Sequence, residues 1–161
     1  MEWKYFSLEQ INSKEGEDWK VWEQPESETR SLSAFKGAEA ARRQGDDAFN
    51  RFHFELLSAR HSQGEDLSPE SVLNAAKQAG VDLNQFGLDL QDEGLLARLA
   101  SDHQEAVGRK VFGTPTIYFG DNGAYMKMRP ATTGEDAVRF FETFRQIVSG
   151  DVNIGEIKRP S

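Results

Sequence analysis

The sequence predicts an α/β fold in a single domain spanning residues 1–161. Three observations support this. Aromatic side chains alternate over residues 2–7, which indicates a short strand. Residues from about 31 to 108 carry apolar side chains at helical spacing and form a helical block. A β-hairpin and a C-terminal helix are then expected over about 111–150.

Composition and charge exclude several classes of function. With 19 basic and 27 acidic residues the net charge is -8 at pH 7, so nucleic acid and membrane surfaces are poor candidate partners. The chain has no cysteine, which excludes a disulfide framework and thiol chemistry by its own residues. The first residues lack the basic and apolar regions of a signal peptide, so we expect a cytoplasmic protein.

Residues 8–30 are rich in acidic side chains and show no clean period, which is typical of a solvated surface loop. Trp19 and Trp22 are three residues apart and therefore share one side of a helical turn. We expect such a turn to attach this loop to the body of the protein.

Helix signals recur through the block at 31–108. A stripe of apolar residues begins at Leu32, and a second helix begins at Asp46 and Asp47, whose charges suit a helix N-terminus. Ser68 is a predicted N-cap with proline at the next position, and Asp92 opens a further helix after a short turn at 83–90.

The pattern changes after residue 110. Residues 116–119 are β-branched and aromatic, residues 120–123 form a predicted turn, and residues 124–128 alternate again. Residues 132–135 match a capping box. The helix that follows is expected to bury its apolar side chains, which are Ala137, Val138, Phe140, Phe141, Phe144, Ile147 and Val148.

No catalytic or metal-binding pattern is found among the polar residues. His53, His61 and His103 are not at metal-ligand spacing and are expected to have structural or surface roles. The paired acids at 46–47 and 92–93 stand where helices begin, so capping is their expected role. We therefore predict no catalytic residue, no metal and no cofactor.

One local motif carries more information. In Gly113-Thr114-Pro115-Thr116, the proline precedes a strand and cannot donate a hydrogen bond to a sheet, so it belongs at an edge or a bend. Gly113 permits a sharp turn there. Taken alone, the tetrapeptide is consistent with an ordinary proline at the start of a strand.

The order of elements gives this motif a context. Strand, loop, helical block, proline strand, hairpin and final helix over about residues 2–150 resemble a DsbA-like thioredoxin fold with a helical insertion. More specifically, the sequence resembles the branch related to 2-hydroxychromene-2-carboxylate isomerase and FrnE-type oxidoreductases. It is carried by residues 6–12, 40–45, 49–57, 71–73, 79–82, 106–108 and 111–116.

The resemblance implies a peptide-binding role for Gly113, Thr114 and Pro115. In that family the corresponding proline is cis, it faces a C-x-x-C cysteine from a near-central strand, and the preceding residue offers its backbone to a bound peptide. The family's first strand and helix, which carry C-x-x-C, precede the strand expected at 2–7. Relative to the family, the chain is thus expected to be truncated at its N-terminus. Isomerase and kappa-type glutathione transferase relatives use a serine in that same segment.

Three functions remain open. The first is a thiol–disulfide oxidoreductase-like protein whose redox segment is absent from this chain. The others are a non-catalytic peptide-binding module and a glutathione-dependent isomerase or transferase. The expected partners are a protein or peptide thiol or disulfide, with glutathione as an alternative. A homodimer is also expected, because strands 2–7 and 116–120 would each have an unpaired edge, unless residues 8–30 cover the gap.

Overall fold

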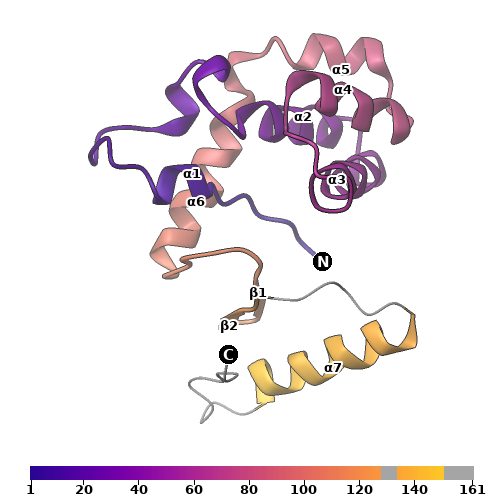
Figure 1. Ribbon diagram of the computed structural model, residues 1–161. Helices are drawn as coiled ribbons and strands as arrows, with labels where there is room; N and C mark the ends of the chain where they lie inside the picture. The colour runs from indigo at the N-terminus through magenta and orange to yellow at the C-terminus, as the bar shows by residue number, and fades with distance from the viewer. Residues whose placement is uncertain (128–133, 151–161) are drawn as a thin grey trace. The chain divides into compact units, whose positions relative to one another are not determined.

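The computed structural model describes residues 1–127 and 134–150 (Figure 1). The chain divides into two compact units, Met1–Arg109 and Lys110–Ser161. The first unit is helical and holds the buried core, whereas the second combines a β-hairpin with one helix. No helix within the described residues is both long enough and apolar enough to cross a bilayer.

The first unit confirms the helical block predicted over 31–108. Its elements are α1 (Leu8–Ile11), η1 (Val21–Glu23), η2 (Glu26–Glu28), α2 (Leu32–Arg43), α3 (Asp46–His61), α4 (Pro69–Gln78), α5 (Leu83–Asp89), η3 (Glu93–Leu96) and α6 (Ala97–Gly108). Ser68 is the N-cap of α4, as predicted, because its hydroxyl accepts a hydrogen bond from the Ser71 N–H at 3.2 Å. Asp92 caps a single 3-10 turn, η3, from which α6 continues.

The core of this unit lies around α2, which packs against α3 and α4 (Figure 1). The helices approach closely because many interface residues are small. The fully or nearly fully buried side chains include Leu32, Ala38, Ala40, Ala41, Phe49, Phe52, Ala76, Phe86 and Leu99. The loop at 8–30 is attached to this core as expected, but its fully buried residue is Val21, while both tryptophans remain partly exposed.

The strand predicted at residues 2–7 is not formed. The Tyr5 N–H donates to Asp102 Oδ2 at 3.1 Å, and the Ser7 N–H donates to His103 Nδ1 at 3.2 Å. Alternating sequence favours an extended backbone, but a strand also requires a second strand to pair with. Here side chains of α6 accept the hydrogen bonds that a neighbouring strand would otherwise take, and no strand within the described residues pairs with this segment.

The second unit contains β1 (Thr116–Phe119), β2 (Asn122–Tyr125) and α7 (Glu135–Gly150). The strands are antiparallel, with Ile117 opposite Ala124. The turn is shorter than the predicted 120–123, because Gly123 already belongs to β2. The Tyr118 ring lies across this glycine, where an added Cβ would be 2.4 Å from Tyr118 Cε1. Met128 and the capping threonines at 132 and 133 lie outside the described residues.

Helix α7 forms at the predicted position, but its apolar face is not buried. The Phe119 ring contacts Phe141 and Phe144, with ring centroids 5.9 and 6.1 Å apart. Val138 remains 65% exposed and Phe140 44% exposed. The expected burial was therefore wrong, because two four-residue strands cover only part of a sixteen-residue helix.

Gly37 in α2 supplies a test of the packing around this helix. A Cβ at this position would lie 2.5 Å from Val72 Cγ1 and 2.9 Å from Phe52 Cζ. We expect Gly37→Ala to lower the free energy of unfolding by about 1–3 kcal/mol, because both neighbours are buried and cannot move freely. Urea denaturation followed by far-UV circular dichroism measures this change.

The matched control is Gly87→Ala in α5, where a Cβ meets nothing within 4 Å. Alanine favours a helix by up to about 1 kcal/mol over glycine, so this variant should keep or gain stability. Equal stability of the two variants would show that the contact at Gly37 does not constrain the core.

Candidate functional site

The segment that leads into β1 is fixed by two hydrogen bonds. The Thr116 hydroxyl donates to the Gly113 carbonyl at 2.7 Å, and the Met126 N–H donates to the Pro115 carbonyl at 3.1 Å. The first bond closes a tight loop, and the second continues the β1–β2 ladder by one residue. The peptide bond between Thr114 and Pro115 is cis.

Gly113 is the buried member of this loop. The Tyr125 ring lies against it, so that an added Cβ would stand 3.0 Å from Tyr125 Cε2. The Phe112 ring packs on the same tyrosine, with centroids 5.2 Å apart, while 70% of Phe112 is exposed. Glycine at position 113 therefore lets the loop approach β2 without displacing the Tyr125 ring.

Thr114 is the member of the loop that can contact a ligand through its backbone. It is exposed, and within the described residues neither its N–H nor its carbonyl has a hydrogen-bond partner. Because Pro115 bonds to β2, the alternation of an antiparallel pair directs the backbone of Thr116 to the opposite edge of β1. Among the described strands β1 pairs only with β2, so this opposite edge has no strand beside it.

The three predicted substrate-binding residues thus form one short loop with distinct environments. Gly113 is buried, whereas Thr114 and Pro115 are exposed beside the edge of β1. Pro115 cannot donate a hydrogen bond, so the exposed N–H donor of this loop is that of Thr114. An exposed strand edge of this kind can bind an extended peptide by strand addition.

His53 packs among aromatic side chains. The His53 ring lies 4.3 Å from that of Trp3 and 5.4 Å from that of Phe49. Burial, and then the charge of Arg42, lower the pKa of His53. Nε2 of His53 is buried without a partner in the described part of the chain. No group of three or more His, Asp or Glu residues in that part could hold a metal ion.

His103 is 4% exposed, and its Nδ1 accepts the hydrogen bond from Ser7. Burial, and then the charge of Lys20, lower the pKa of this histidine, which favours the neutral ring that such a bond requires. Sequence reasoning assigned His103 a structural or surface role but did not identify its partner, 96 residues away. No local signal indicates such a contact.

A second polar cluster, also missed from the sequence, anchors the N-terminal segment to α2. The Tyr5 hydroxyl donates to Glu39 Oε1 at 2.7 Å, and Arg42 Nε donates to the same oxygen at 2.8 Å. The Arg42 guanidinium lies 3.5 Å above the centre of the Phe49 ring. Burial, and then the bond to Glu39, raise the pKa of Tyr5, so its hydroxyl stays a donor. The cluster is internally paired and serves packing.

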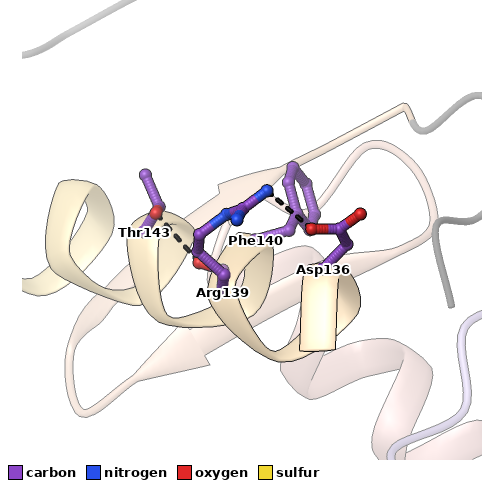
Figure 2. Close-up of a pocket in the computed structure, with 4 residues that line it drawn as sticks. All are labelled: Asp136, Arg139, Phe140 and Thr143. Atoms are coloured by element: carbon purple, nitrogen blue, oxygen red, sulfur yellow. Dashed lines mark hydrogen bonds and ion pairs between the residues drawn. The ribbon is translucent and has the colours of Figure 1, made fainter. Parts of the chain in front are cut away.

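Two surface hollows among the described residues are candidate ligand-binding sites. One lies on α7 and is lined by Asp136, Arg139, Phe140 and Thr143 (Figure 2). Arg139 pairs with Asp136 at 2.6 Å, and the Thr143 hydroxyl donates to the Arg139 carbonyl at 2.9 Å (Figure 2). These polar groups satisfy one another within a single helix, so they do not converge on a ligand.

The other hollow, of about 330 Å³, lies in the first unit and is lined by Met1, Glu2, Trp3, Arg42, Asp46, Phe49, Asn50 and Arg98. Its two arginines are balanced by its two carboxylates, and Arg42 is already paired with Glu39. The loop at 113–115 is therefore the better candidate for a binding site.

Comparison with known families agrees with this architecture. The family model described as DSBA-like thioredoxin domain matches residues 7–145, which include all of α1 to α6, both strands and most of α7. A comparison with curated proteins gave no match. The helical block, the loop before β1 and the hairpin lie wholly within the matched region. The fold is a thioredoxin-like α/β fold, and the chain belongs to the family of DSBA-like thioredoxin domains.

Proposed function

We propose that this chain binds an extended polypeptide along the edge of β1 that begins at Thr114. One observation carries the proposal: Thr114 is exposed, and its N–H and carbonyl lack partners within the described residues. A bound peptide backbone would supply an acceptor and a donor for these two groups. Each bond formed in this way contributes about 0.5–1.5 kcal/mol.

The structure around Thr114 supports binding without a large ordering cost. The bonds of Thr116 to Gly113 and of Met126 to Pro115 hold the loop on both sides of Thr114. A preorganised loop loses little conformational freedom when a ligand binds, so more of the interaction energy appears as affinity.

The proposed biochemical setting is that of a thiol–disulfide oxidoreductase-like protein, in the branch related to FrnE and the isomerases. In this setting the natural ligand is a protein or peptide that carries a thiol or a disulfide. Glutathione, a short peptide thiol, is the smaller ligand of the same chemistry. None of the 161 residues is cysteine, so the thiol that performs exchange must come from outside this sequence.

The first prediction from this proposal concerns thiol–disulfide exchange. The purified 161-residue chain should not reduce or exchange a protein disulfide, because it contains no sulfur nucleophile. Reduction of insulin by dithiothreitol, followed by turbidity with and without the chain, measures this activity. A rate above the buffer blank, from a preparation free of other oxidoreductases, would contradict the prediction.

The second prediction concerns peptide binding at the edge of β1 that begins at Thr114. Titration of the isotope-labelled chain with a short extended peptide rich in Val and Thr should shift the amide signals of Thr114 and Thr116. Thr114→Pro removes one donor and should weaken binding by about 2–10-fold, the value of one hydrogen bond.

Thr114→Ala is the matched control, because it keeps the backbone N–H and loses only the side chain. It should bind as the unchanged chain does. Equal affinity of all three chains would show that the backbone of Thr114 does not contact the peptide, and a far-UV spectrum would verify that each variant is folded.

The third prediction concerns a second copy of the chain, which is the competing occupant of this edge. We expect the isolated chain to dimerise through β1, because the edge that begins at Thr114 has no strand beside it within the described residues and such an edge is a template for pairing. Light scattering over a dilution series measures the mass, and saturating peptide should shift a dimer toward monomer. A mass of about 18.1 kDa at every concentration would exclude the dimer.

A further inference from the structure

The attachment of the N-terminal segment to α6 depends on two neighbouring side chains. Asp102 is 5% exposed and accepts a hydrogen bond from the Tyr5 N–H. His103 is 4% exposed and accepts a hydrogen bond from the Ser7 N–H. A carboxylate accepts hydrogen bonds over the whole neutral pH range, whereas an imidazole nitrogen accepts one only while it carries no proton. The two attachments therefore differ in their response to acid.

Ser7 connects His103 to the rest of the loop. Its hydroxyl accepts the Gln10 N–H at 3.1 Å and so caps α1. The Gln10 side chain in turn accepts the Val21 N–H at 2.7 Å and donates to the Trp19 carbonyl at 2.9 Å. Residues 7–22 are thus joined to α6 through a chain of hydrogen bonds that begins at one imidazole nitrogen.

The ring of His103 lies among aromatic and charged groups from three parts of the first unit. Phe6 stacks on it with centroids 4.9 Å apart, and the Trp22 ring lies 5.6 Å away. Charged residues in these parts include Glu2 and Lys4 in the N-terminal segment, Lys20 and Glu23 in the loop, and Arg98, Asp102 and Glu105 in α6. Lys4 pairs with Asp102 at 3.5 Å and with Glu105 at 3.0 Å, and Arg98 pairs with Asp102 at 3.5 Å, so both carboxylates already have cationic partners.

We propose that His103 is a proton-sensitive attachment, whose protonation loosens residues 7–22 from α6 while α2, α3 and α4 remain folded. A proton on Nδ1 turns the acceptor into a donor that faces the Ser7 N–H, so two donors oppose each other. Tyr5 keeps its bonds to Asp102 and Glu39, so the N-terminal segment remains attached at that point. Within the described residues, the hydrogen bond of His103 goes to Ser7 and not to α2, α3 or α4.

The direction of the pH effect follows from linkage. In the attached state burial and the Lys20 charge hold the pKa of His103 below its ordinary 6.5, and in the loosened state the ring regains that value. The loosened state therefore binds more protons than the attached state in acid. The attachment is at full strength above about pH 6.5 and weakens as the pH falls below it.

The tryptophans of the chain make this testable, since Trp3, Trp19 and Trp22 are its only three. In a Trp3→Phe background, which removes the tryptophan beside His53, the emission should shift to longer wavelength between about pH 6.5 and about pH 5. The far-UV spectrum of the helices should not change over this interval. In the same background His103→Gln should lose the shift, because the glutamine oxygen accepts the Ser7 N–H and does not titrate.

His61→Gln is the matched control and should keep the shift. A shift that persists in His103→Gln, or one that coincides with loss of the helical spectrum, would overturn the proposal. If His103→Gln does not fold, amide exchange in the Trp3→Phe chain decides. Opening at Gln10 and Val21 should then increase in acid relative to opening at Phe52, and parallel behaviour of these amides would overturn it.

Discussion

The requirement that every backbone N–H finds an acceptor shapes both units of this protein. An extended segment exposes one row of such groups on each side, and its surroundings must provide acceptors or leave it to water or a ligand. In the first unit Asp102 and His103 provide them for residues 5 and 7. In the second unit β2 provides them for one side of β1, and the side that begins at Thr114 has no strand beside it within the described residues.

Small residues allow the helices of the first unit to pack into a close core. Alanines at 38, 40, 41, 75 and 76 are all nearly or fully buried, and Gly37 admits Val72 and Phe52 where any side chain would collide. Close packing of this kind makes α2, α3 and α4 mutually dependent. The loop at 8–30 has a different basis, since buried Val21, the partly buried Trp19 and Trp22, and a few hydrogen bonds attach it. That difference is why part of the unit can loosen while the rest stays folded.

The proposed binding site and thiol chemistry involve different groups. The loop at 113–115 has the geometry to pair with an extended backbone, and neither bond that fixes it involves a titratable group. The family match covers this loop, and the binding proposed for it needs no cysteine in the chain. Under the proposed function, exchange would depend on a thiol brought to the peptide, because Gly113, Thr114 and Pro115 carry no group that exchanges with a disulfide.

The sequence alone determined the elements whose causes are local. Helix caps at Ser68 and Asp92, the acidic start of α3 and the β-branched run of β1 act within a few residues, so the helical block and the hairpin were predicted. The loop at 113–115 was predicted for the same reason, since Gly113, Thr114 and Pro115 are adjacent, whereas the peptide-binding role proposed for it came from family resemblance. The accessible backbone of Thr114 was visible only in the structure.

Tertiary structure decided what depends on distant partners. Residues 2–7 have the alternation of a strand, but α6 side chains nearly a hundred residues away take their hydrogen bonds, and no local pattern encodes that choice. The apolar stripe of α7 predicted burial, yet burial depends on the area of the surface that covers the helix, and two short strands leave Val138 and Phe140 exposed. Periodicity identifies which face of an element is apolar, whereas its neighbours determine how much of that face is covered.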